Sequence, residues 1–430
     1  MALQHPIRVP WEGRESDLPR VFGEFHAIAG RKNIVKRLAW IANQLNDPFL
    51  RGHITDKFSL ELALFEVTTF FKKHGQFPPV SNPRVYQLFA FISQVTAIHK
   101  QLSSCGMRQL TGRIQDGLKS DYGLAPLDAE FSIIAHVSKR GFEIEFADFA
   151  GSGQFEYLIE RDGLEIELEC KTIGADIGRR IKRKPLFRLY KLLDPTIRTC
   201  LARINGGMLI RISVTNALPT HERELNGVAR IIEQTLLLGQ PASPSSEHCR
   251  VEVHKFEMAS SPFGANSGKE LSEDAIDSFV HRYTGRMNAE SMHAFRPGKA
   301  ALVLVVVSDA EDDGVNDWFA EPRKSVNRQF SGTRPAIMVV QMLGLSSKAL
   351  LEIANDDMSG LAARNGLQVA ATRILDEPSR KHLHSLIIRG HPSPEFLNQH
   401  DGGVEEKAPT YCFYNSGNAY ANDPRCRIFK

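Results

Sequence analysis

Two different spacings of apolar residues follow one another along this chain. Residues 34–45, 60–71 and 85–102 place apolar side chains three and four positions apart, which is typical of helices with one buried face. Residues 17–120 are therefore expected to be mainly helical, with a break in the proline-rich stretch 78–83.

From residue 126 the pattern predicts one helix followed by three strands. Residues 126–140 carry apolar side chains at helical spacing and precede a glycine, a common helix stop. Residues 141–148, 154–160 and 165–171 then alternate with a period of two, as half-buried strands do. A helix beginning at Pro185 and a strand at 207–214 come next. The predicted order is helix, three strands, helix, strand.

The second and third strands form a predicted hairpin. Asp162 and Gly163 between them are a strong signal for a two-residue turn. With that turn, every cross-strand pair has residue numbers with the same sum, so Glu156 lies opposite Glu169, and Lys171 shares their face. The other face is expected to be core and carries Phe155, Tyr157, Ile159, Ile166, Leu168 and Cys170.

Opposed glutamates repel each other unless a cation lies between them. A divalent metal ion held by Glu156 and Glu169 would relieve that repulsion, and Lys171 would position a water or neutralise charge growing on a phosphate. Glu160 and Glu165 form a second opposed pair in the same register. The alternative interpretation is an ordinary amphipathic hairpin with its charged face in solvent.

An acidic residue on the second strand, with Glu169-Cys170-Lys171 on the third, resembles the PD-(D/E)XK nuclease superfamily. The core of that family has the element order predicted here, and the resemblance covers about residues 122–215. It implies that Glu156 and Glu169 bind Mg²⁺ or Mn²⁺, that the Cys170 carbonyl completes the metal shell, and that Lys171 assists the attacking water.

Two further acidic residues belong to this expectation. Glu156 stands where the family usually has aspartate, so Asp148, at the end of the first predicted strand, is an alternative ligand. Glu130 lies on the first helix, where some members of the family contribute another acidic residue. Its alternative role is that of a solvated helix glutamate.

A basic segment follows the hairpin and suits contacts with phosphates. It contains no acidic residue, and a solvated helix face remains the alternative. Its candidate nucleic-acid-binding residues are Arg179, Arg180, Lys182, Arg183, Lys184, Arg188 and Lys191.

The expected fold is mixed α+β and α/β in three parts. Residues 1–121 form a helical N-terminal domain, 122–258 the restriction-endonuclease-like core, and 259–430 an α/β region that either extends the core sheet or stands alone. In this last part the apolar strands 300–307 and 336–342 flank a helix and predict a buried parallel pair.

Composition is consistent with this interpretation without requiring it. The 430 residues carry a net charge of +3, so affinity for nucleic acid has to come from a local patch. The six cysteines form no C-x-x-C pair, which argues against a structural zinc site and a disulfide scaffold. No signal core or membrane-spanning run is present, so a cytoplasmic protein without membrane contact is expected.

The hypothesis from sequence is a metal-dependent endonuclease that hydrolyses phosphodiester bonds, of DNA in preference to RNA. By family analogy, such a chain serves in bacterial defence or in a mobile element. The alternative is a catalytically inactive nuclease-like module that binds nucleic acid or a protein partner. The helical N-terminal part would then mediate partner binding or homo-oligomer formation.

Overall fold

The computed structural model describes residues 3, 5–10, 13, 15–46, 54, 57–174, 176–238, 249–264, 273–285, 289–312, 314–344, 350–351, 353–355, 366–390, 393–396 and 404–429. The chain divides into two compact units. Unit 1 is Met1–Ile177 with Val315–Lys430, and unit 2 is Gly178–Gly314. Unit 2 is therefore inserted in the sequence of unit 1.

Unit 1 combines a six-stranded sheet with helices. Its helices are α1 (Leu18–Ala29), α2 (Arg31–Leu45), α4 (Ser59–His74), α5 (Pro83–Gln101), α6 (Ser104–Gly117), α7 (Ala125–Lys139), α8 (Ala147–Ala150), α12 (Gly314–Gln329) and α14 (Leu367–Leu375). Its sheet strands are β1 (Glu143–Phe146), β2 (Tyr157–Arg161), β3 (Leu164–Gly174), β8 (Ala336–Leu343), β9 (Leu383–Arg389) and β12 (Thr410–Tyr414).

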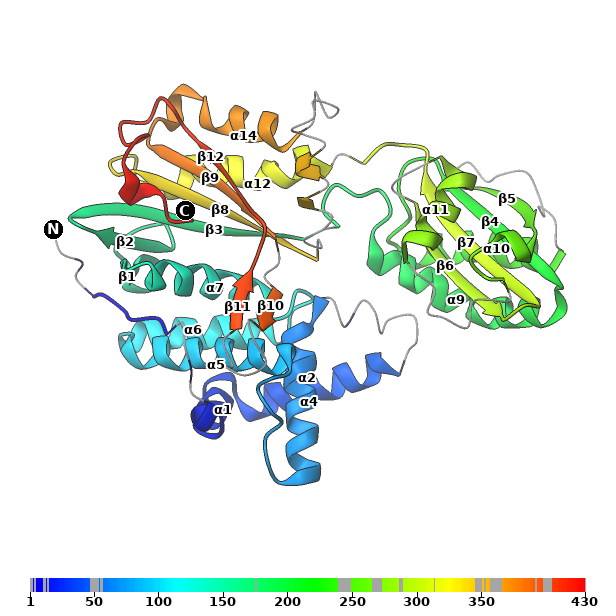
Figure 1. Ribbon diagram of the computed structural model, residues 1–430, viewed down its shortest axis with the longest axis horizontal. Coiled ribbons are helices and arrows are strands. Elements are labelled where there is room, and N and C mark those ends of the chain that lie inside the picture. Colours follow the sequence, from blue (N-terminus) through cyan, green and yellow to red (C-terminus); the bar gives the residue numbers. More distant parts are fainter. Residues whose placement is uncertain are drawn as a thin grey trace. The chain divides into compact units, whose positions relative to one another are not determined.

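The strands of this sheet follow the order β1-β2-β3-β8-β9-β12. β1, β2 and β3 are joined antiparallel, β8 and β9 run parallel to β3, and β12 is antiparallel to β9. In Figure 1, α12 and α14 lie over one face of the sheet, while α7, with α5 and α6 beyond it, covers the other. Both faces are thus buried, which explains why β8 is apolar at every position except Gln341.

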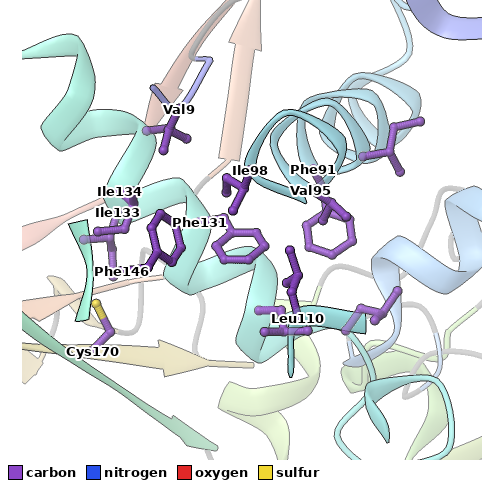
Figure 2. Close-up of a cluster of buried hydrophobic side chains, with 14 of the residues drawn as sticks. Val9, Phe91, Val95, Ile98, Leu110, Phe131, Ile133, Ile134, Phe146 and Cys170 are labelled. Carbon is purple, nitrogen blue, oxygen red and sulfur yellow. The ribbon is translucent and has the colours of Figure 1, made fainter. Parts of the chain in front are cut away.

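The helical layer and the sheet share one hydrophobic core. Phe131 of α7 lies between Phe91 of α5 and Phe146 of β1, with ring centroids 6.2 and 6.4 Å apart (Figure 2). Val9 and Cys170 belong to the same cluster. The N-terminal helices form where the sequence predicts them, but they pack onto the sheet as a layer of unit 1.

Unit 2 contains a second mixed sheet with the order β5-β4-β7-β6. Its strands are β4 (Gly206–Val214), β5 (Cys249–Phe256), β6 (Glu290–Arg296) and β7 (Ala300–Ser308), and its helices are α9 (Arg183–Arg203), α10 (Glu222–Leu238) and α11 (Glu273–Thr284). β4 and β7 run parallel in the centre, with an antiparallel strand on each side.

The two units correct several expectations about which strands are neighbours. Strand 207–214 is β4 and lies in unit 2, so the prediction that it completes the sheet of the hairpin is wrong. The predicted parallel pair of 300–307 with 336–342 is also wrong, because β7 pairs with β4 and β8 pairs with β3. The nested division likewise differs from the three consecutive domains 1–121, 122–258 and 259–430. Helical and strand periodicities reveal that a face is buried but not which segment covers it.

The C-terminal strands extend the sheet of the hairpin, which was one of the two expected arrangements. A short antiparallel pair, β10 (Ser393–Phe396) with β11 (Val404–Lys407), was not predicted. Residues 347–364 also have a sequence typical of a helix, and most of them lie outside the described residues. In the part of the chain that the structure describes, the helices are too short or too polar to cross a membrane.

Candidate functional site

The hairpin folds in the register predicted from its turn. β2 and β3 pair antiparallel, and the ladder begins with Tyr157 opposite Leu168. Asp162 and Gly163 form the turn with φ angles of 51° and 77°. A type I′ turn needs positive φ at both of these positions, which explains the aspartate and glycine. The predicted hairpin is confirmed.

Glu156 directly precedes β2, and hydrogen bonds connect it to β3. The Glu156 N–H donates to Glu169 Oε2 at 3.0 Å, and the Cys170 N–H donates to Glu156 Oε2 at 2.8 Å. These two bonds continue the hairpin beyond the end of the β2 ladder. The structure thus brings Glu156 and Glu169 together, as the register requires.

Lys171 lies beside this pair and donates a hydrogen bond from Nζ to Glu169 Oε1. The side chain of Glu169 is fully buried, and that of Lys171 is 21% exposed. Burial lowers the pKa of Lys171, but the charges of Glu169 and Glu156 outweigh this effect, so its pKa is raised overall. Lys171 therefore keeps its positive charge at neutral pH.

Glu130 extends from α7 into the same site. Arg113 Nη1 donates to Glu130 Oε1 at 3.1 Å, Arg113 Nη2 donates to Oε2, and the Tyr157 hydroxyl donates to Oε1. The carboxylate contributes to the raised pKa of both Glu156 and Glu169. Glu130 is therefore a buried member of the site and not a solvated helix glutamate.

Asp148 lies on the short helix α8 and not at the end of a strand. β1 ends at Phe146, because residues 147–150 form one helical turn that Gly151 closes with a φ of 70°. Asp148 Oδ2 lies 3.6 Å from Arg113 Nη1. Burial raises the pKa of Asp148 to about 6, against the attraction of Arg113.

The site contains more carboxylates than cations. Burial raises the pKa of Glu156 well above its ordinary value, and the Glu130 and Glu169 carboxylates raise it further. Lys171 and Arg113 act in the opposite direction but do not cancel the effect. Crowded carboxylate oxygens are the ligands that Mg²⁺ and similar hard cations prefer. The residues present therefore fit a divalent cation.

Cys170 contributes through its backbone only. Its thiol lies on the opposite face, in the hydrophobic core shown in Figure 2, where burial raises its pKa well above the ordinary value. The Cys170 N–H faces the open edge of β3 beyond β2. Because the N–H and C=O of one strand residue point to the same edge, the Cys170 carbonyl is directed to that edge too.

The carboxylates do not form a ready-made metal cage. Among the described residues, no group of three His, Cys, Asp or Glu side chains converges as metal ligands do. The oxygens of Glu169 accept hydrogen bonds from Lys171 and from the backbone, and those of Glu130 from Arg113 and Tyr157. The predicted metal-binding role of Glu156, Glu169, Cys170 and Asp148 stays a prediction.

The basic segment belongs to the other unit. Arg179 pairs with Glu290, and the Arg180 backbone N–H donates to Asp312 Oδ1 at 2.8 Å. Its exposed members are Lys182, Lys184, Arg188 and Lys191. All seven predicted cations belong to unit 2, whereas the carboxylate site belongs to unit 1.

Two members of the site were not predicted to function there. Arg113 lies in α6, inside the stretch expected to be a separate helical domain, and its sequence surroundings contain no motif. Tyr157 was assigned to the core, and the structure confirms its burial, but its hydroxyl binds Glu130. The sequence did offer one signal for Tyr157, because a buried tyrosine hydroxyl on the apolar face of a strand needs a hydrogen-bond partner.

Comparisons with known proteins found no counterpart of this chain. Neither the scan against protein-family models, nor the search of curated proteins, nor the search of solved structures returned a match.

Proposed function

We propose that this protein is a metal-dependent nuclease that hydrolyses phosphodiester bonds, with DNA preferred over RNA. The observation that carries the proposal is the convergence of Glu156, Glu169 and Lys171 at one end of the β2–β3 hairpin, in a buried site with excess negative charge. The chemistry of these groups matches what phosphoryl transfer to water requires.

The order of elements in unit 1 supports the same proposal. α7, β1, β2 and β3 are followed by α12 and by β8, which runs parallel to β3. When unit 2 is treated as an insertion, this is the order helix, three strands, helix, strand that characterises the PD-(D/E)XK core. The last helix and strand of this order are then α12 and β8, and not α9 and β4 as expected from the sequence.

Each residue then has a defined task. Glu156 and Glu169 would hold Mg²⁺ or Mn²⁺, with the Cys170 carbonyl as a neutral ligand at the same edge. When bound, such an ion polarises a phosphoryl oxygen and lowers the pKa of a water molecule. Lys171 remains protonated, so it does not act as a general base. It would donate hydrogen bonds and neutralise charge on the phosphate.

The direct test is DNA cleavage by the full chain. Plasmid, linear duplex and single-stranded DNA are incubated with Mg²⁺ or with Mn²⁺, using wild type, Lys171→Met, and Lys119→Met as an exposed control in the same unit. We expect metal-dependent cleavage that falls by about a hundredfold or more in Lys171→Met and is unchanged in Lys119→Met.

Equal cleavage by wild type and Lys171→Met would contradict the proposed site. DNA binding by all three proteins without cleavage in either metal would favour the alternative, an inactive nuclease-like module.

DNA contact is proposed for the exposed cations of α9 in unit 2. Changing Lys182, which directly precedes α9, and Arg188 of α9 together to Gln should make the slope of log K against log salt concentration for DNA binding less steep by about two, as expected for two lost phosphate contacts. Arg198→Gln on the same helix is the control, because both Asp194 oxygens lie 2.8 Å from Arg198 Nε. A salt dependence unchanged in the double variant would remove α9 from the DNA interface.

A further inference from the structure

Arg113 connects two acidic side chains that come from different elements. Its guanidinium binds both oxygens of Glu130 on α7 in a fork and lies 3.6 Å from Asp148 on α8. The ring of Phe149, with its centroid 5.6 Å from the guanidinium carbon, packs against it. A bidentate guanidinium held by a neighbouring ring is a fixed cation.

The carboxylates of the site therefore separate into two pairs. At the end of the hairpin, the Glu156 N–H donates to the Glu169 carboxylate and the Cys170 N–H donates to the Glu156 carboxylate. Glu130 and Asp148 are linked through Arg113, and the Tyr157 hydroxyl completes the hydrogen bonds of Glu130. Arg113 contacts both members of the second pair, whereas the cation beside the first pair, Lys171, donates to Glu169.

We propose that Arg113 takes the place of a second divalent cation, so that the site binds one metal ion, at Glu156 and Glu169. This inference rests on the proposed metal dependence. In two-metal sites the second ion lies about 4 Å from the first and needs carboxylate oxygens of its own. Here the guanidinium occupies the oxygens of Glu130 that such an ion would need.

The inference is tested by counting bound ions, independently of catalysis. Free Mn²⁺ is measured by electron paramagnetic resonance while the purified full chain is titrated. Wild type should bind one ion per chain, and Arg113→Met should bind two, because its Glu130 and Asp148 are released. Arg108→Met, an exposed arginine on the same helix, is the matched control and should bind one. Adding Glu130→Gln to Arg113→Met should return the count to one.

Glu130→Gln in the wild-type background tests the idea even if Arg113→Met fails to fold. Because Glu130 is not a ligand of the bound ion, the count should stay at one, while the loss of its negative charge beside Glu156 weakens Mn²⁺ affinity. A lost ion, or two ions in wild type, would overturn the inference. One ion in a folded Arg113→Met would do the same and leave the nuclease proposal intact. No bound Mn²⁺ in wild type would contradict the proposed function itself.

Discussion

The β2–β3 hairpin carries acidic side chains at both ends of one face, and the two ends are built differently. Near the turn, Arg334 donates to Glu165 at 2.7 Å and lies 3.4 Å from Glu167, while the Ser331 N–H and hydroxyl also donate to Glu167. The turn itself satisfies Glu160, which accepts the Gly163 N–H at 2.6 Å. This end is complete without a ligand.

At the other end of the hairpin, buried carboxylates lie close enough together that Glu130 raises the pKa of both Glu156 and Glu169. Lys171 donates to Glu169 Oε1, and the pKa of Glu156 is raised well above its ordinary value by burial and by neighbouring carboxylates. The alternating sequence is the same at both ends of the hairpin. The segments that pack around each end therefore distinguish the acidic cluster bound by Arg334 and Ser331 from the one at which we propose a metal ion.

The largest expected difference between the two ends is in catalysis. Glu169→Gln should lower metal-dependent DNA cleavage by about a hundredfold or more, because it removes a charged metal ligand. Glu165→Gln, on the same face near the turn, should leave cleavage within about twofold. Initial rates on plasmid DNA in Mn²⁺ measure both. Similar losses in the two variants would mean that the ends do not differ in function.

At the turn end, we expect a loss of stability without a loss of cleavage. Arg334→Met removes a cation from the buried carboxylate of Glu167 and should lower the free energy of unfolding by about 1–3 kcal/mol. Urea unfolding without divalent ions measures the loss, and cleavage at low temperature should stay normal. A variant as stable as wild type would show that Ser331 alone satisfies Glu167.

Glu156→Gln should have a smaller effect on the free energy of unfolding than Arg334→Met, and of opposite sign. Its amide oxygen can still accept the Cys170 N–H, while one of the crowded negative charges disappears. We expect the metal-free variant to gain about 1 kcal/mol at pH 8, together with loss of cleavage. A destabilised Glu156→Gln would contradict the view that crowded carboxylates at this end of the hairpin destabilise the metal-free protein.

The hairpin, its register and the pairing of Glu156 with Glu169 were predictable, because they depend on residues close in sequence. Asp162 and Gly163 specify the turn, and the period of two then determines which side chains share a face. The order α7, β1, β2, β3 was predictable for the same reason, because the pattern of each element is local in the sequence.

What surrounds the hairpin was not predictable. Arg113 reaches Glu130 from α6, and β8 pairs with β3 although all of unit 2 separates them in sequence. Long-range neighbours depend on the fit between buried faces, and the periodicities of β4, β7 and β8 are equally consistent with several partners. The structure brings together the hairpin residues that the sequence singled out, Glu156, Glu169 and Lys171, and adds Arg113, which the sequence did not indicate.

The smallest predicted effect concerns pH and Asp148. Its pKa is raised to about 6 by burial, so the folded protein binds this proton more tightly than the unfolded chain does. Stability from this group is therefore present at pH 4 and is lost as the pH rises through about 6.

In EDTA, the free energy of unfolding of wild type should fall across this window by about 1 kcal/mol more than that of Asp148→Asn, since partial exposure weakens the effect. Asp116→Asn, which changes an exposed aspartate of α6, should behave as wild type. Parallel curves for wild type and Asp148→Asn would mean that Arg113 fully compensates the burial of Asp148, and the excess negative charge would then be confined to Glu156 and Glu169.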